Sequence, residues 1–583
     1  MINKYFYNLS VTITGIITAI FILTTVGGLF HIPVNPFYVF IPFVGGVFYL
    51  KKQSNENIDF LKQMLILMLI IMFSYFLAIS VWDCSWDGRS SHIATVILLK
   101  KGWLPIYDNY KTFAETCNVY PQVAFWGNCY LRFTEVIGAN IYKLTDLIES
   151  AKTVNFIMLF SVFMYSFCVL SIEKKNIVFP FLSAFVVTFN PVCIYQWFTN
   201  YIDLHIYFSF TLLILTIVKI EFQKNAGKTD LFVFVCSSIM LAMTKFTGSM
   251  YLSIIVFLYF IYLVILKREI KNYVKIIGVT GLLLILTGIS PFYTNFRDFE
   301  HPFYPLFGQN KINISSENIP YSFKEKNNAE RFFISTFSET LNSVDDSVEK
   351  IEIMKITPKL KIPFTINKES IFNCFYCADM RIGGFGYFWS GILLLSLIYL
   401  PFIRFRNKNE KNIFWLITTL ILCTTFANPH SWWARYVPQL WLFPIFIFIF
   451  GLLQEDFANN LSKKVKNFVL YSIIIVCVLN SWIVVEQNTD FNLRLTKYLK
   501  APYNYIDSIK SKNSKIYLMK LPEWENMEIA DETIHPHLEE FYGKENIIDV
   551  SYDEKKIFLG EFIPFQKQAY VVNRPCYFFK IEE

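Results

Sequence analysis

The stretch MLILMLIIMFSYFLAISV, residues 64–81, contains no charged residue, and the polar stretch WDCSWDGRSSH, residues 82–92, follows it directly. An apolar run of this length can cross a bilayer as a helix, because the hydrocarbon core is about 30 Å thick and each helical residue rises about 1.5 Å. The polar stretch brings four ionisable side chains to the mouth of that span: Asp83, Asp87, Arg89 and His92. This junction indicates both the fold class and the place where a function is to be sought.

Apolar runs of the same kind recur along the whole chain. Hydrophobic residues make up 54% of the sequence and charged residues only 17%, whereas about a quarter of the residues in a soluble protein are charged. We therefore expect an all-α polytopic membrane protein. Its thirteen spans are predicted near residues 11–30, 36–50, 64–82, 151–171, 177–195, 203–219, 231–247, 249–266, 275–291, 386–403, 412–427, 436–453 and 467–486.

The basic residues of the short loops predict the orientation of these spans. With thirteen spans, all the basic loops fall on one side, which the positive-inside rule makes the cytoplasmic side. These loops are Lys51–Lys52, Lys174–Lys175, residues 219–228, Lys267–Lys275, Arg404–Lys411 and Lys463–Lys466. Three long segments, residues 83–150, 292–385 and 487–583, then face the exterior. The net charge of +7 reflects the short loops, so no nucleic-acid partner is expected.

The sequence predicts two domains. Residues 1–486 form a transmembrane domain that includes the first two long exterior segments. Residues 487–583 form a small α/β exterior domain, because SKIYLMKL (residues 514–521) and KIFLGEFI (residues 556–563) alternate apolar and polar residues as short strands do. An exterior compartment is oxidising, and Cys117 with Cys129 is the first pair to consider for a disulfide.

The predicted spans carry no acidic or basic residue near their middles. Ion-coupled transporters place ionisable groups at mid-membrane, where proton and ion relays need them. Here the polar residues gather at one rim instead. This distribution favours a reaction at the outer membrane surface over a pathway across the membrane.

Each residue of the polar stretch has a structural and a functional interpretation. Asp87 precedes Gly88 and could begin a turn, or its carboxylate could accept a proton from a substrate hydroxyl. Asp83 could be a boundary residue or a second catalytic carboxylate. The remaining candidates are Trp86, Arg89 and His92. Arg89 and His92 could be solvated loop residues or substrate-binding groups. Trp86 could belong to an interfacial aromatic belt or stack against a sugar ring.

Two cations lie at the outer ends of other predicted spans. Lys245, in MTKFTG, could extend to lipid headgroups or bind the phosphate of a lipid-linked donor. Arg435, in the outer turn NPHSWWAR, runs against the usual loop bias, which favours a specific anionic partner. His430 in the same turn is a further candidate for substrate binding.

The rim motifs resemble those of one enzyme superfamily. WDGRSSH with the downstream KKGWLPIYD, HPFYPLFG (residues 301–308) and SWWARYVPQLWLFP (residues 431–444) are similar to bacterial members of the GT-C superfamily of integral-membrane glycosyltransferases. A long exterior loop that opens with acidic residues after an early span adds to this resemblance. The motifs themselves cover only some forty residues of the chain.

The resemblance implies an activity and roles for particular residues. It implies a GT-C-like fold in a bacterial inner membrane, with the active site facing the periplasm. The donor would be a sugar on polyprenyl phosphate, and the acceptor an envelope glycan, lipid or protein. Asp87 would be the catalytic base, with Asp83 as the second candidate. The loop contains no DxD triplet, which argues against a metal-dependent oligosaccharyltransferase. The sequence indicates no cofactor, and a divalent metal is left open.

Two other function classes remain open at the level of the sequence. A lipid-linked glycan ligase or polymerase would also join glycans outside the membrane, although more exterior arginine residues would be expected. A transporter or flippase would need mid-membrane polar groups or an internal repeat, and the sequence shows neither.

Overall fold

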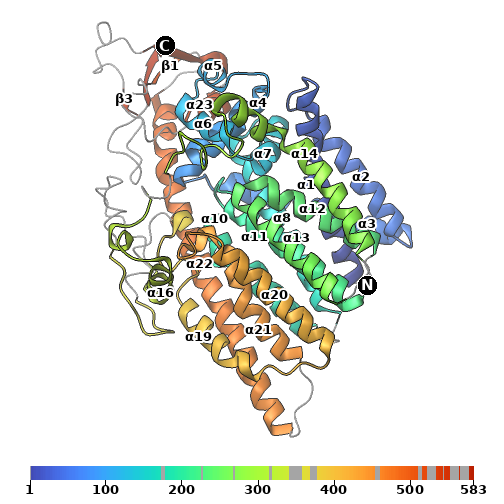
Figure 1. Ribbon diagram of the computed structural model, residues 1–583. Coiled ribbons are helices and arrows are strands. Elements are labelled where there is room, and N and C mark those ends of the chain that lie inside the picture. The colour runs from blue at the N-terminus through green and yellow to red at the C-terminus, as the bar shows by residue number, and fades with distance from the viewer. Residues whose placement is uncertain are drawn as a thin grey trace.

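The computed structural model describes residues 2–172, 177–224, 227–266, 270–313, 318–340, 357–367, 377–453, 460–509, 515–520, 534–542, 544–551, 563–564 and 577–582. The long helices are α1 (Ile2–Leu29), α2 (Phe37–Gln53), α3 (Asn57–Ser80), α8 (Thr153–Leu170), α9 (Val178–Thr188), α11 (Asp203–Gln223), α12 (Lys228–Thr244), α13 (Phe246–Ile265), α14 (Lys271–Phe299), α19 (Trp389–Tyr399), α20 (Lys408–Phe426), α21 (Leu442–Leu453) and α22 (Asn460–Ile509). Figure 1 shows these helices gathered into one bundle.

Shorter elements connect and cover the long helices. They are η1 (Gly88–His92), α4 (Ile93–Lys100), α5 (Tyr110–Thr116), α6 (Pro121–Cys129), α7 (Phe133–Thr145), η2 (Ile148–Lys152), α10 (Pro191–Gln196), η3 (Tyr321–Phe323), α16 (Asn328–Phe337), η4 (Cys377–Asp379), η5 (Leu400–Phe402), η6 (Ala434–Tyr436), η7 (Pro438–Trp441), α23 (Ile534–Tyr542) and η9 (Lys544–Asn546). The strands are β1 (Lys515–Lys520), β2 (Ile547–Ser551), β3 (Ile563–Pro564) and β4 (Tyr577–Glu582).

A mainly helical polytopic fold is confirmed. Every predicted span overlaps at least one described helix, and seven of the described stretches are long and apolar enough to cross a membrane by length and composition. These seven are Ile2–Leu29, Asn57–Ser80, Ile148–Leu170, Asp203–Gln223, Phe246–Ile265, Tyr273–Phe299 and Lys466–Ala501. The number of thirteen crossings stays a prediction, since several of the remaining helices are shorter.

Two predicted spans differ in shape from the expectation. The span near 177–195 is two helices, α9 and α10, because the Asn190 side chain accepts from the Val192 amide and Pro191 begins a new helix. The span near 275–291 is part of the longer α14, which has non-helical dihedrals at Ser290. Proline disfavours the helical conformation of the residue before it, so Pro291 places a bend near the end of this span.

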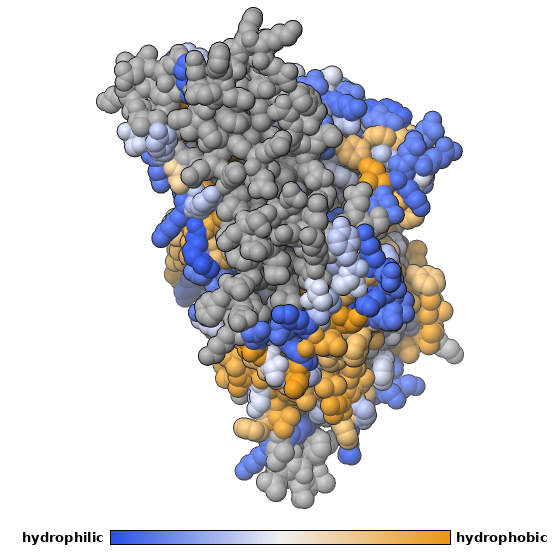
Figure 2. All heavy atoms as spheres, turned by 90° about the vertical axis from the view of Figure 1, so that its left-hand side faces the viewer, coloured by the Kyte–Doolittle hydropathy of each residue, from blue (hydrophilic) through white to orange (hydrophobic). Residues whose placement is uncertain are grey.

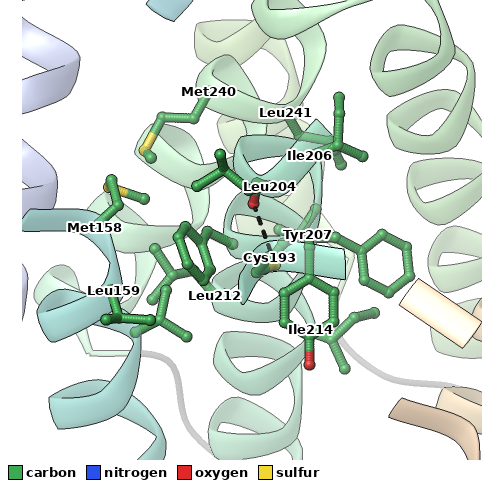
Figure 3. Packing of buried hydrophobic residues seen from close by; sticks show 14 of the residues in the cluster. Met158, Leu159, Cys193, Leu204, Ile206, Tyr207, Leu212, Ile214, Met240 and Leu241 are labelled. Carbon is green, nitrogen blue, oxygen red and sulfur yellow. Dashed lines mark hydrogen bonds between the residues drawn. The ribbon is translucent and has the colours of Figure 1, made fainter. Parts of the chain in front are cut away.

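The bundle core is built around α11, whose apolar window is 89% buried. Figure 3 shows the side chains of α11 meeting residues of α8, α10 and α12, among them Met158, Cys193 and Met240. Polar contacts join other helices: Ser10 Oγ of α1 donates to the carbonyl of Ser161 on α8 at 2.8 Å. Short polar side chains allow close helix packing where apolar burial gives little preference between protein and lipid. This packing fixes the helix ends that carry the rim residues.

The first long segment and the strands after α22 lie at one end of the bundle, which we call the loop end and which carries α5, α6, α23 and β1 (Figure 1). Helix α16 of the second long segment lies beside α19. The first long segment folds into η1 and α4–α7, and its Ile148 amide donates to Glu540 of α23. The Arg297 guanidinium, near the start of the second long segment, donates to the carbonyl of Ile106 at 2.7 Å. In Figure 2, apolar residues gather in the lower half of the molecule, away from this end.

The chain after residue 486 begins inside a helix. Helix α22 is continuous from Asn460 to Ile509, so it passes through the expected domain boundary at 486/487. Beyond it, the described strands form one sheet in the order β2-β1-β4-β3. Strand β1 is parallel to β2 and antiparallel to β4, with Ile516 opposite Ile547 and Ile581. The division into two domains stays a prediction.

The predicted disulfide is wrong. Cys117 and Cys129 are both free thiols. Cys117 caps the C-terminus of α5, whereas Cys129 is the last residue of the nine-residue helix α6 that follows. The two thiols thus stand at the ends of two different helices, and no disulfide joins them.

Candidate functional site

Asp83 is a buried anchor of the first long segment. Its side chain is 0% exposed and accepts four hydrogen bonds: from the amide and hydroxyl of Ser85 at 2.8 and 2.6 Å, and from the amide and side-chain nitrogen of Asn200 at 2.7 and 2.8 Å. Burial raises the pKa of this carboxyl, although Lys152 and the Ser85 bonds oppose the shift. Asp83 therefore ties the polar stretch to the turn between α10 and α11.

The chain around Asp83 is packed tightly. A Cβ added at Gly88 would lie 2.3 Å from the Asp83 carboxylate, so only glycine fits there. Arg89 is buried, and its guanidinium donates to the Asp83 carbonyl at 2.9 Å. The Asp83 amide donates to Glu149 at 3.0 Å. Arg89 and Asp83 thus hold the loop in shape, and a part for either of them in substrate binding or catalysis stays a prediction.

Asp87 has a different environment. It stands just before η1, makes no side-chain cap of that turn, and its side chain is 35% exposed. One carboxylate oxygen forms an ion pair with Arg435 at 3.0 Å. The carboxylate of Asp87 therefore does not stabilise the local turn, and it reaches a residue from a distant segment.

Arg435 lies at the centre of the rim residues. Its guanidinium contacts three carboxylates, Asp87 at 3.0 Å, Asp203 at 3.1 Å and Asp379 at 2.7 Å, and lies 4.6 Å from the centroid of the Tyr201 ring. Burial disfavours its charge, but the three carboxylates outweigh burial and raise the pKa of Arg435. We call the group Asp87, Asp203, Lys245, Asp379 and Arg435 the Arg435 centre.

Lys245 joins the same centre from the opposite side. It is the one extended residue between α12 and α13, and its ammonium lies 2.8 Å from Asp203. The two oxygens of Asp203 thus contact the two cations, Oδ1 with Lys245 and Oδ2 with Arg435. The side chain of Lys245 is only 14% exposed. Because it turns inward to a buried carboxylate, the interpretation that it extends to lipid headgroups does not hold.

Sequence reasoning missed two residues of this centre. Asp203 was visible as an acidic residue in the outer turn QWFTNYID (residues 196–203), although nothing in the sequence linked that turn to Arg435. Asp379 lies in the second long segment and had no distinguishing motif. Arg381 adds a further cation, because it forms an ion pair with Asp379 at 3.2 Å.

The other predicted site residues lie around the centre rather than in it. His92 bonds to Glu135 at 2.7 Å and its ring lies 6.2 Å from that of Tyr201. Trp86 is half-buried beside Asp87. His430 packs near Trp432 and Tyr436, and burial together with Arg331 lowers its pKa. The structure thus brings together Asp87, Lys245 and Arg435. Trp86, His92 and His430 form neither an ion pair nor a cation–π contact with Arg435.

Within the described ranges, no group of three or more His, Cys, Asp or Glu side chains is arranged to hold a metal ion. The three carboxylates of the centre converge on a guanidinium.

Comparisons with known proteins give one kind of match. No protein-family model matches the sequence, and no curated protein matches it either. Two crystal structures of ArnT from Cupriavidus metallidurans are similar in fold over 88% of this chain and 97% of theirs. The structure bound to undecaprenyl phosphate is 10% identical with a TM-score of 0.42, and the apo structure 9% identical with a TM-score of 0.44. A likeness this loose assigns neither a family nor a function to the present chain.

Proposed function

We propose that this protein is a glycosyltransferase that moves a sugar from a polyprenyl-phosphate-linked donor to an envelope glycan, lipid or protein acceptor at the outer membrane face. One observation carries the proposal. Lys245 and Arg435 converge on the two oxygens of a single carboxylate, Asp203, beside the partly exposed Asp87. Two mostly buried cations beside a partly exposed carboxylate at the rim of a helical bundle are suited to transfer from a lipid phosphate.

The two cations would bind the phosphate of the donor. Phosphate and carboxylate are both oxyanions that accept hydrogen bonds from ammonium and guanidinium groups. A donor phosphate at the centre would therefore compete with Asp203 and Asp87 for Lys245 and Arg435. As the bond between the sugar and the phosphate oxygen breaks, negative charge grows on that oxygen, and preorganised cations lower the barrier most where charge develops.

Asp87 would serve as the general base. The acceptor hydroxyl attacks the anomeric carbon, the new bond forms to the acceptor oxygen, and the hydroxyl proton passes to the Asp87 carboxylate. Once the phosphate engages Arg435, the Asp87 oxygen that now pairs with Arg435 is available to the acceptor. Asp83 suits this role less well, because it is fully buried and already accepts four hydrogen bonds.

The experiment is transfer by the purified full-length protein. Labelled polyprenyl-phosphate sugars would be incubated with the protein and with envelope extracts as acceptor, with and without a chelator. Transfer that is retained with the chelator and lost in Arg435→Gln and Lys245→Gln is the expected result. A protein in sealed vesicles that moves the labelled lipid across the bilayer and transfers no sugar would contradict the proposal and favour a flippase.

A further inference from the structure

Arg132 is a buried cation outside the Arg435 centre. It stands at the N-cap of α7 and is 7% exposed. Its guanidinium donates to the carbonyls of Gly127 and Asn128 and to the Ser290 hydroxyl, and lies 5.4 Å from the centroid of the Trp103 ring. All these partners are neutral, and among the described residues no carboxylate lies within 4.0 Å of it.

The absence of a paired anion is unusual for a buried charge. Burying a cation is costly unless a counter-ion and hydrogen bonds compensate. Glu135 is the acidic residue whose charge acts on Arg132. Its carboxylate is already hydrogen-bonded to His92 at 2.7 Å and to the Thr134 hydroxyl at 2.8 Å. Burial lowers the pKa of Arg132 to about 10, so its guanidinium keeps its charge at neutral pH. The site around Arg132 is therefore complementary to an anion.

A cavity adjoins this cation. It lies between α1, the chain after α4, the start of α7 and α14, and both Arg132 and Trp103 line it. The rest of its wall is mostly apolar and includes Phe21, Leu29 and Ile289. The indole N–H of Trp103 is buried and has no hydrogen-bond acceptor. The cavity reaches the surface at its edge, where the lining residue Ile32 is 49% exposed.

We propose that this cavity binds an anionic membrane lipid, with a hydrocarbon chain against α1 and α14 and the phosphate at Arg132 and the Trp103 indole N–H. An apolar wall with a cation and one spare donor matches an amphiphile rather than a soluble anion. A guanidinium is the preferred protein group for a phosphate. This lipid site does not depend on whether the Arg435 centre transfers sugar.

The cavity lies close to the proposed donor site. Met243 of α12 lines the cavity, whereas Lys245, two residues later, contacts Asp203. Tyr130 lies two residues before Arg132, and Phe246 directly follows Lys245. The centroids of these two rings are 5.4 Å apart. We assign the cavity to a lipid other than the sugar donor, and the titration with a polyprenyl monophosphate described below tests that assignment.

Native mass spectrometry of the full-length protein in detergent tests the proposal. The delipidated protein would be titrated with phosphatidylglycerol, phosphatidylcholine and a polyprenyl monophosphate. We expect retention of one phosphatidylglycerol, preferred over phosphatidylcholine by about tenfold, since a specific charged contact is worth about 1.4 kcal/mol or more. Arg132→Gln keeps side-chain donors but removes the charge, so this preference should fall toward unity, and Arg132→Lys should restore part of it.

A cavity-filling variant with a matched control locates the lipid. A Cβ added at Gly28, which lines the cavity, meets only Leu104 at 3.9 Å, so Gly28→Leu should enter the cavity without disturbing the backbone. Gly281→Leu on α14 is the control, because its Cβ meets nothing within 4 Å. Phosphatidylglycerol retention should drop about tenfold in the first variant and not in the second. If Gly28→Leu fails to fold, Ile289→Phe fills the same cavity from α14.

Two outcomes would overturn the proposal. Equal retention of phosphatidylglycerol by the filled variants and the wild type would show that the lipid binds elsewhere. Loss of polyprenyl monophosphate binding in Gly28→Leu, with phosphatidylglycerol unaffected, would assign the cavity to the donor chain.

Discussion

Asp83 and Asp87 occupy the same polar stretch, each directly after a tryptophan, and their environments are opposite. Asp83 is fully buried and its oxygens accept four hydrogen bonds from Ser85 and Asn200. Asp87 is 35% exposed and has one ion pair, with Arg435. The same residue type thus serves as a buried anchor at one position and as a partly exposed ion-pair partner at the other.

The difference shows that partners, rather than residue type, assign the role. A carboxylate whose oxygens are filled by local donors stabilises the fold and has no room for a substrate proton. A carboxylate paired with one arginine can exchange that partner when another anion arrives. The proposed chemistry at Asp87 therefore depends on the competition at Arg435, and substitutions at the two aspartates should have separable effects.

The largest expected effect comes from Asp87→Asn. Asparagine keeps the size of the side chain but cannot accept the acceptor proton, so sugar transfer should fall about 10²–10⁴-fold. The side chain is partly exposed, so the melting temperature should change little. Labelled-sugar transfer and thermal unfolding of the same preparation check both parts. A variant that transfers at the wild-type rate would refute the assignment of the base.

Next in size is the loss of a cation. Arg435→Gln and Lys245→Gln should each lower transfer about 10²–10³-fold, the range seen when one preorganised donor to a developing oxyanion is removed. Both effects should appear in turnover as well as in donor affinity, because the charge on the leaving phosphate grows in the transition state. Arg494→Gln is the matched control, because the Arg494 side chain is 68% exposed and forms an ion pair with Asp490 one turn away. A similar loss in that control would point to a general effect of charge.

Asp83→Asn should act on stability instead. The amide nitrogen of asparagine would face donors of Ser85 and Asn200, and each buried donor left unsatisfied costs about 1–3 kcal/mol. We expect a lower melting temperature, with the transfer rate per folded molecule close to the wild type. If Asp83→Asn folds with unchanged stability and transfers no sugar, the roles of the two aspartates are reversed.

The smallest effect concerns the contact between α23 and the first long segment. Burial raises the pKa of Glu540 from 4.5 to about 8, and its carboxylate accepts from the Ile148 amide. The folded protein therefore holds a proton there that the unfolded chain releases, so this contribution to stability is greatest below pH 4.5 and declines as the pH rises toward 8. Hydrogen exchange of α23 should be faster at pH 8 than at pH 6.

Glu540→Gln is the control for that pH dependence. Glutamine still accepts from the Ile148 amide but has no charge to bury, so exchange in α23 should become nearly independent of pH in this window. A wild-type exchange rate that does not change between pH 6 and 8, after correction for intrinsic exchange, would contradict the assignment.

The sequence located the helices well because lipid allows few alternatives. In hydrocarbon every backbone amide must bond within its own segment, so an apolar run of sufficient length becomes a helix. The sequence predicted the ends of the helices less well. Pro191 divides one predicted span, and α22 runs on to Ile509, because helix ends depend on capping side chains and on packing of the loop end.

The sequence by itself determined the helical membrane architecture and three rim residues, Asp87, Lys245 and Arg435, because a charge at the end of an apolar run is costly and stands out. Only the tertiary structure decided which charges meet. Asp203 and Asp379 join Arg435 from segments that no spacing connects, and Asn200 makes Asp83 an anchor from the turn between α10 and α11. These pairings depend on distance in space, and a distance in space between remote segments leaves no trace in a single sequence.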